Sequence, residues 1–427
     1  MNNTGADNNT KPANTPLRPS AAADTSDSCA DATMDFSDIA PYDQSQFREK
    51  LASLLLEPGF EHAVRYVMPG VDFQEFSRRL RAVQTQRQFQ ADVMGGFLED
   101  LERRTTGGIT ASGAENLADG ASYTFISNHR DIVLDASFLN LCLLRYNKPL
   151  TQVAIGNNLL IYDWISDLVK LNRSFIVKRD VRRLEALAAA RKLSAYIHRT
   201  ITVTGQSVWI AQREGRAKDS NDLTQESLVK MLAIAGQGTV SQRLEQINLL
   251  PVAISYEYDP NDYLKVREFL LRRRNPDFKK SQHDDLLSME TGLLGYKGRV
   301  HFHFGKCITP ALAEAAVADT DTDSTAARNA VIRRACSLVD SSIHSSYCFY
   351  PINYYAYDRI ENTRRFADKV SDADRDSIRA YMTSRLDKVQ LADITADERA
   401  FMEQVFLSMY ANPVRNFLAA TAAGAPL

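Results

Sequence analysis

The spacing of apolar and polar residues changes along the chain, and each change marks a region with a different expected structure. Residues 1–35 are rich in Asn, Thr, Ala, Ser, Asp and Pro and contain almost no large apolar side chains. Such a segment cannot bury enough surface to offset the entropy lost on ordering, so we predict a disordered tail. From 36 to 105, apolar residues recur at three- and four-residue spacing, which predicts a helical N-terminal region. The stretch "TTGGITASG" then predicts a break.

The segment from 106 to 315 alternates between short β-like runs and longer helical patterns. Four of the intervening segments carry apolar residues at helical spacing: 132–146, 159–172, 181–202 and 224–236. The β-like runs are 122–127, 151–156, 174–179, 207–212, 247–258 and 299–308. This alternation predicts an α/β domain with a mostly parallel central sheet flanked by helices. The pattern of 316–427 is again helical, so we expect a helical C-terminal extension.

Composition narrows the class of protein. The formal net charge is −2 with 24% charged residues, so no global charge attracts nucleic acid and any anion site must be local. The five cysteines lack CxxC or Cys/His spacing, which argues against a disulfide framework or a zinc site and favours a reducing compartment. The N-terminus does not resemble a signal peptide, and no run approaches ~18 apolar residues. We expect a cytoplasmic protein that is soluble or lies on a membrane surface.

The stretch "FISNHRDIVLDASFLN" carries the first candidate chemistry. His129 follows the run 122–127 directly and precedes an apolar helix, a place where ligands gather in parallel α/β sheets. Asp135 stands six residues later and could orient the imidazole, which would leave its other nitrogen free as a general base. Asp131 is the fallback partner, although it also fits as a first-turn acid favoured by the helix dipole. In the plainer alternative, His129 is a polar loop residue.

Two basic clusters follow two other expected strands. Arginine suits bidentate contact with phosphate, and a glycine permits close approach of the backbone, so the clusters predict a pocket for a phosphate monoester. The alternative is a pair of solvated basic loops. The residues concerned are Lys178 and Arg179 in one cluster, and Arg213, Glu214, Gly215, Arg216 and Lys218 in the other.

Four sequence blocks resemble those of a known superfamily. "SNHRDIVLD", "SFIVKRD", "WIAQREGRAKD" and "LLPVAISYEY" are similar, in order and spacing across 125–258, to the blocks of the glycerolipid acyltransferases. This superfamily includes glycerol-3-phosphate and 1-acylglycerol-3-phosphate acyltransferases. The His-Arg pair, "VAIGNNLL" and the Tyr-Glu after the fourth block resemble the bacterial glycerol-3-phosphate branch. The resemblance implies an acyltransferase α/β domain over 106–315.

The chain departs from the family pattern at two places. The family places four residues between His and Asp, whereas position 134 is Leu here and the acid stands at Asp135. We favour Asp135 as the partner because a turn before the helix can absorb one extra residue. The third block usually reads Glu-Gly-x-Arg and is one residue shorter here. The phosphate contact that the resemblance assigns to Arg216 is therefore open to Arg213 and Lys218.

The resemblance implies direct acyl transfer in phospholipid synthesis. His129 would remove a proton from an acceptor hydroxyl as it attacks an acyl thioester, carried by acyl-CoA or acyl carrier protein, with Asp135 orienting His129. Arg179, Arg216 and Lys178 would hold the phosphate of glycerol-3-phosphate or lysophosphatidic acid. Glu214 would align the arginines or bind acceptor hydroxyls. No metal, no cofactor, no acyl-enzyme and no nucleic acid partner are expected.

Two alternatives stay open at this point. The acceptor is another lyso-lipid, such as a lyso-amino-acid lipid whose carboxylate the same arginines hold, or the protein is an inactive relative that binds anionic lipid. The substrates imply a peripheral position on the inner face of the cell membrane. The basic stretch 262–280 is either a lipid-docking helix or a solvated one. His301 and His303 share one strand face but lack an evident third metal ligand.

Overall fold

The computed structural model describes residues 34–179, 181–317 and 324–422. Residues 1–33 of the disordered tail predicted for 1–35 lie outside the described residues. From Phe36 on, the described residues form one compact unit. The domain boundaries expected near 106 and 315 inside that unit stay predictions.

A single seven-stranded sheet organises this unit, in the order β1-β7-β6-β2-β5-β3-β4. All neighbouring strands pair in parallel except β6 and β7. The strands are β1 (Ile109–Ser112), β2 (Thr124–Ser127), β3 (Gln152–Gly156), β4 (Ser174–Val177), β5 (Val208–Ala211), β6 (Leu249–Tyr256) and β7 (Val300–Phe304). The expected fold class, α/β with a mostly parallel sheet, is confirmed.

The six strands expected from the sequence all form, and one further strand was missed. Strand β1 lies inside "TTGGITASG", whose sequence predicts only a break. It forms because Ile109 pairs with Val300, which lies 191 residues further along the chain, and because Ile109 is buried in the core of the sheet domain. A four-residue edge strand that depends on such a distant partner is hard to recognise from the local sequence pattern.

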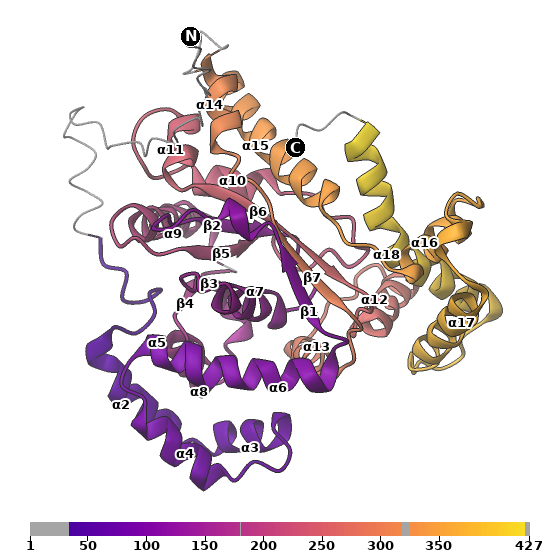
Figure 1. Ribbon diagram of the computed structural model, residues 1–427, viewed down its shortest axis with the longest axis horizontal. Coiled ribbons are helices and arrows are strands. Elements are labelled where there is room, and N and C mark those ends of the chain that lie inside the picture. The colour runs from indigo at the N-terminus through magenta and orange to yellow at the C-terminus, as the bar shows by residue number, and fades with distance from the viewer. Residues whose placement is uncertain (1–33, 180, 318–323, 423–427) are drawn as a thin grey trace, which may run out of the picture. The chain divides into compact units, whose positions relative to one another are not determined.

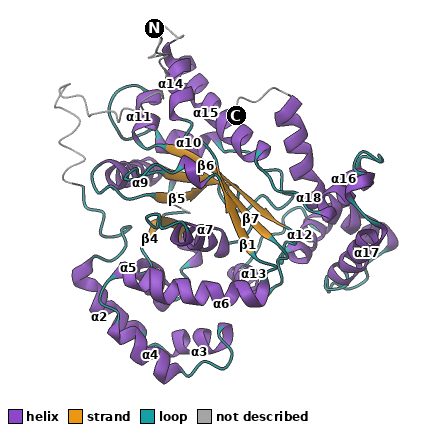
Figure 2. Ribbon diagram, in the orientation of Figure 1, coloured by secondary structure: helices purple, strands orange, loops and turns teal. Residues whose placement is uncertain are grey.

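Helices cover both faces of the sheet (Figures 1 and 2). One face carries α9 (Arg183–Thr202), α10 (Glu226–Leu232), α11 (Val240–Gln246), α14 (Thr309–Val317) and α15 (Thr325–Ser345). The other carries α6 (Gly95–Thr105), α7 (Leu134–Arg145), α8 (Asp163–Leu171) and α13 (Gln282–Leu294). Helix α7 is buried on most of its surface, as its nearly continuous apolar sequence requires.

The N-terminal region folds as short helices with a core of their own. Phe47, Leu54 and Phe89 are among its buried residues, and Leu171 of α8 joins them. Asp43 begins the first helix by accepting hydrogen bonds from the Ser45 and Gln46 amides. The helices are α2 (Gln44–Leu54), α3 (Pro58–Val67), α4 (Phe73–Ala82), α5 (Gln86–Gln88) and the π-helix η1 (Phe89–Met94), which runs into α6.

The C-terminal region forms a third core together with α12 (Asp262–Arg274). Val266 and Leu270 of α12 are fully buried against it, while Arg273 pairs with Asp397 and Arg274 with Glu398. The other helices here are α16 (Pro351–Ile360), α17 (Asp372–Leu386) and α18 (Ala396–Ala422). The described ranges also contain three short 3₁₀ turns: η2 (Ala114–Asn116), η3 (Asn157–Leu159) and η4 (Ala367–Lys369).

None of the helices described is both long and apolar enough to cross a membrane.

Candidate active site

The residue before the histidine fixes where the histidine stands. The Asn128 side chain donates to the Ile254 carbonyl at 2.9 Å and accepts from the Ile254 amide at 2.8 Å. This fully buried amide therefore continues the β2–β6 ladder by one step beyond Ser127. His129 follows at once, at the carboxyl edge of the sheet where the sequence placed it.

His129 and Asp135 are in direct contact. The Nδ1 atom of His129 lies 2.7 Å from Oδ2 of Asp135. The same oxygen accepts the Arg130 amide at 2.6 Å and the Asp131 amide at 3.0 Å. Asp135 is fully buried, so its charge depends on these donors for stabilisation. The carboxylate therefore fixes both the imidazole and the loop that carries it.

Asp131, the fallback partner, does a different job. Its Oδ1 accepts the amides of Val133 and Leu134 at 2.9 and 2.8 Å, which caps the start of α7. Its Oδ2 lies against Gly292 of α13, where a Cβ atom would come within 2.0 Å. Burial raises the pKa of Asp131, and the nearby charge of Asp135 raises it further. Of the two acids, only Asp135 is hydrogen-bonded to His129.

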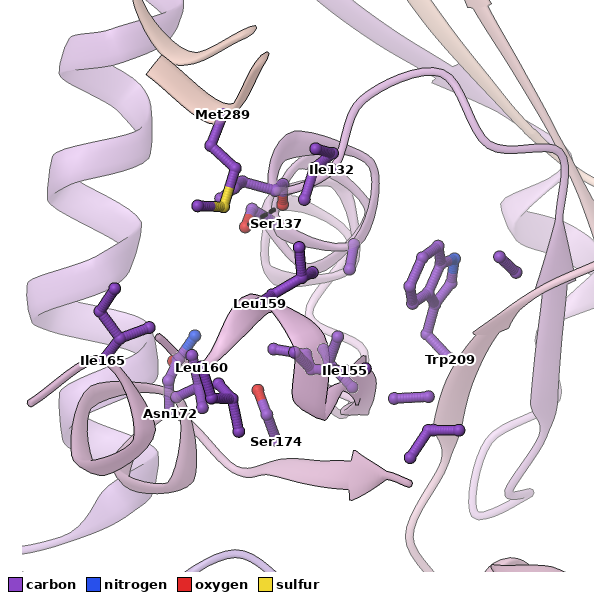
Figure 3. Close-up of a pocket in the computed structure, with 18 of the residues that line it drawn as sticks. Ile132, Ser137, Ile155, Leu159, Leu160, Ile165, Asn172, Ser174, Trp209 and Met289 are labelled. Atoms are coloured by element: carbon purple, nitrogen blue, oxygen red, sulfur yellow. Dashed lines mark hydrogen bonds between the residues drawn. The ribbon is translucent and has the colours of Figure 1, made fainter. Parts of the chain in front are cut away.

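A large apolar cavity lies on one side of His129. Its volume is about 1020 Å³, and its walls come mainly from α7, α8, β3, α9 and α13. Figure 3 shows Trp209 at one end, Ile155 and Leu159 near the middle and Ile165 at the other end. The Trp209 ring meets the His129 imidazole edge-on, with centroids 5.8 Å apart. The space is of the kind that receives an alkyl chain.

A second, polar cavity of about 550 Å³ also has His129 on its wall. No described residue forms a hydrogen bond with Nε2 of His129, so this nitrogen is available to a ligand. Of the residues expected from the sequence, this cavity brings together His129, Arg179, Arg213, Glu214, Gly215, Arg216 and Lys218.

Arg179 reaches this cavity because Gly156 leaves room for it. A Cβ on Gly156 would lie 2.7 Å from Nε of Arg179. The backbone amide of Arg179 donates to Oδ1 of Asn157 at 2.7 Å. The Nε atom of Arg179 lies 3.8 Å from the Glu214 carboxylate. "VAIGNNLL" therefore contributes the glycine and the asparagine that place a basic side chain.

The third block supplies two arginines with unused donors. Nε of Arg213 and Nη1 of Arg216 are buried and have no hydrogen-bond partner among the described residues. Gly215 between them has φ +67°, a left-handed conformation that glycine adopts freely. Lys218 is paired with Glu268; burial lowers its pKa and the carboxylate opposes that change. The free donors favour Arg213 and Arg216 over Lys218 as ligands for an anion.

The structure separates Lys178 from these residues. Its ammonium group pairs with Asp38, which also binds Lys192 at 2.6 Å, and its side chain lines the apolar cavity. Lys178 is absent from the wall of the polar cavity. Its expected contact with a phosphate stays a prediction without support from this geometry.

One residue of the first block has a role that the sequence did not reveal. Arg130 is buried and pairs with Asp222 through two nitrogens, at 2.6 and 3.2 Å. The Tyr347 hydroxyl donates to the same carboxylate at 2.6 Å. Asp222 lies 92 residues away in the sequence, so its pairing with Arg130 leaves no local signal. The one hint that Arg130 has a role is its position next to His129. The contact between Arg130 and Asp222 is a second anchor of the histidine loop, in addition to Asp135.

The histidines of β7 do not assemble a metal site in the part of the chain that is described. His301 is hydrogen-bonded to Thr110 and Ser112, both at 2.8 Å, and His303 to Ser112 at 2.9 Å. Burial lowers the pKa of both imidazoles.

Comparisons with known proteins cover the same region. The model of the Acyltransferase family matches residues 108–255, which run from the start of β1 into β6. A solved structure with some likeness is that of the 1-acyl-sn-glycerophosphate (LPA) acyltransferase PlsC from Thermotoga maritima. The identity is 11% and the TM-score 0.35, over 69% of this chain and 91% of that one. No curated protein sequence gives a significant match.

Proposed function

We propose that the protein is a glycerolipid acyltransferase, which moves a fatty acyl group from a thioester to a hydroxyl of a phosphorylated glycerol acceptor. The match of residues 108–255 to the model of the Acyltransferase family supports this proposal. The acceptor is glycerol-3-phosphate or lysophosphatidic acid, and the donor is acyl-CoA or acyl carrier protein.

One observation carries this proposal: His129 lies on the wall of both cavities. The apolar cavity suits the alkyl chain of the donor, and the polar one suits a phosphorylated head group. A thioester and a hydroxyl bound in this way meet at the imidazole. Holding two reactants in such an orientation removes much of the entropic barrier to their reaction.

His129 acts as general base in the proposed reaction. Its Nε2 takes the proton of the acceptor hydroxyl while that oxygen attacks the thioester carbonyl carbon. Asp135 holds Nδ1 and stabilises the imidazolium that forms. When the carbon–sulfur bond breaks, the thiolate leaves with the proton, and His129 returns to its starting state. The products are an ester and a free thiol, and no acyl-enzyme is formed.

The arginines hold the acceptor. Arg179 is placed by Gly156 and Asn157, and the free donors of Arg213 and Arg216 suit a phosphate group. Glu214, within 4 Å of Arg179, aligns that guanidinium. No residue of this arrangement requires a metal ion.

The structure bears differently on the two alternatives, another lyso-lipid acceptor and an inactive lipid-binding relative. A lyso-amino-acid lipid fits the same arginines through its carboxylate, so it remains the second candidate acceptor. The contact between Asp135 and His129 favours an active enzyme over an inactive lipid-binding relative, because the altered spacing does not separate the pair. With lipid substrates, the enzyme works at the inner surface of the cell membrane.

A panel of acceptors tests the proposal. Purified protein is mixed with palmitoyl-CoA, and thiol release is followed with glycerol-3-phosphate, lysophosphatidic acid and lyso-ornithine lipid in parallel. We expect turnover with one of the two phosphorylated acceptors. Turnover with the amino-acid lipid alone would select the second candidate. Folded protein that releases no thiol with any acceptor, from either palmitoyl-CoA or palmitoyl acyl carrier protein, would refute the acyltransferase proposal.

A further inference from the structure

We propose that the first two turns of α9 dock the protein on an anionic lipid bilayer, beside the entrance to the apolar cavity. This inference rests on the proposed function, since it names the surface through which lipid substrates reach the site. Its two central residues are Leu184 and Leu187.

These leucines are exposed to an extent unusual for their type. Leu184 is 96% exposed and Leu187 58%, and they lie one helical turn apart. Ala186 and Ala188 are exposed beside them, and Glu185 is the single charged residue from 184 to 190. A helix that is apolar on every side is normally buried in protein or lipid. No other part of the described chain covers this one.

The same turns form part of the wall of the apolar cavity. Ala186, Ala189, Ala190 and Leu193 line it from α9. Ala186 is both exposed and part of the lining, as are Tyr162 (54% exposed) and Tyr66 (50%). Residues with both properties mark an opening of the cavity, so the exposed leucines stand beside a route for an alkyl chain. Aromatic residues such as these tyrosines favour the membrane interface.

Unpaired cations flank the leucines. Arg182 precedes them and Arg191 follows on the same helical face as Leu184 and Leu187; both are exposed. Neither arginine has an ion-pair partner among the described residues. Exposed cations at the edge of an apolar surface strengthen binding to anionic lipid head groups.

The basic helix α12 was the candidate for this role in the sequence, and its contacts make it the weaker one. Its apolar side is packed in the C-terminal core, and Arg272, Arg273 and Arg274 are paired with Glu268, Asp397 and Glu398. At the start of α9, by contrast, Leu184 and Leu187 are exposed, and Arg182 and Arg191 have no ion-pair partner in the described part of the chain. An acidic acyl carrier protein is the competing occupant of α9, but protruding leucines beside a cavity mouth suit a bilayer better than a protein groove.

The test compares two ends of one helix. Leu184→Glu/Leu187→Glu changes the proposed surface, and Val203→Glu is the matched control, since Val203 is 74% exposed at the far end of α9. Co-sedimentation with phosphatidylglycerol-containing vesicles measures binding. We expect the double variant to bind at least tenfold more weakly than wild type and the control to bind as wild type does. Equal binding by all three proteins would overturn the proposal.

Two further measurements separate the other outcomes. If the enzyme accepts glycerol-3-phosphate, its turnover with this acceptor and octanoyl-CoA should be the same in all three proteins, because both substrates are soluble in water. Wild type that binds vesicles through α9 but has no activity would refute the proposed function and leave the docking surface standing. Loss of turnover with an acyl carrier protein donor, combined with unchanged vesicle binding, would assign α9 to that carrier and overturn the bilayer proposal.

A fluorescence measurement avoids introducing charge. An environment-sensitive dye on Leu184→Cys should shift to shorter wavelength when vesicles are added, whereas the same dye on Val203→Cys should not. A shift of equal size at both positions, or at neither, would contradict the proposal even if the glutamate variants fold poorly.

Discussion

His129 Nδ1 lies 2.7 Å from Asp135 Oδ2, although five residues separate them in the sequence rather than the four of the family pattern. The extra residue is absorbed in the loop, since the amides of Arg130 and Asp131 also bind the Asp135 carboxylate before α7 begins at Leu134. The loop therefore wraps around the acid that orients the histidine. Each part of this arrangement can be changed separately.

Removing the charge of Asp135 should abolish most activity. In Asp135→Asn the amide oxygen can still accept backbone hydrogen bonds, but no charge remains to stabilise the imidazolium. We expect kcat to fall by roughly 1,000-fold or more, the scale seen when such an acid is neutralised. Thiol release under saturating substrate measures it. Asp131→Asn is the control, and it should keep activity within about threefold because that acid caps α7 without touching His129.

Filling the space beside Arg179 should weaken binding of the acceptor. A methyl group at residue 156 would lie 2.7 Å from Nε of Arg179, so Gly156→Ala must displace the guanidinium. We expect KM for the phosphorylated acceptor to rise by about tenfold, the cost of one charge-assisted contact, with a smaller change in kcat. Gly96→Ala is the control, because no atom lies within 4 Å of a Cβ there. An unchanged KM in Gly156→Ala would remove Arg179 from acceptor binding.

The apolar cavity predicts a chain-length effect. Ile165 lies at the end of the cavity opposite Trp209, which in turn contacts His129 (Figure 3). Ile165→Trp should shorten the space for the donor chain. Turnover of palmitoyl-CoA should fall by about tenfold or more, while turnover of octanoyl-CoA stays near the wild-type value. A competition experiment with both donors measures the ratio of the two rates. Equal losses for both donors would indicate general damage or a chain that lies elsewhere.

The Asp38 ion pairs predict a pH dependence of stability. Burial alone would raise the pKa of Asp38, but Lys178 and Lys192 bring it down to about 2. A carboxyl whose pKa is lower in the folded state stabilises the fold above its unfolded pKa, and that contribution is lost as the pH falls from about 4 towards 2. Because the side chain is 37% exposed, solvent screening limits the effect to about 1 kcal/mol.

Urea unfolding of wild type and Asp38→Asn at several pH values measures this contribution. The difference in the free energy of unfolding should be constant from pH 7 to 5 and shrink below pH 4. A difference that persists undiminished at pH 3 would show that the carboxylate charge is not its source.

Much of the fold followed from local pattern. The strands that end before His129 and Arg213 were visible because β-like runs alternate with helical ones, and parallel strands bring their carboxyl ends to one edge. The position of Arg179 beside the histidine followed from the same rule. What the pattern could not supply was pairing over long distances. Strand β1 depends on Val300, far along the chain.

The same limit applies to individual side chains of the site. The sequence grouped Lys178 with Arg179, yet Lys178 turns to Asp38, 140 residues earlier. Arg130 stands next to the histidine in the sequence, but Asp222 holds it in the interior. A strand alternates its side chains between faces, and which neighbour captures each one is decided by tertiary packing. The sequence therefore predicted where the basic residues gather but not which of them keep free donors.

The role of His129 as general base is tested by measuring acyl transfer by His129→Ala beside wild type. Both proteins are checked for equal thermal stability, and transfer of radiolabelled palmitate from its thioester to the preferred acceptor is then measured. We predict that wild type makes the ester and that the variant is slower by about 100-fold or more, the scale of a lost general base. Equal rates in the two proteins would show that His129 is not the general base and would refute the proposed mechanism.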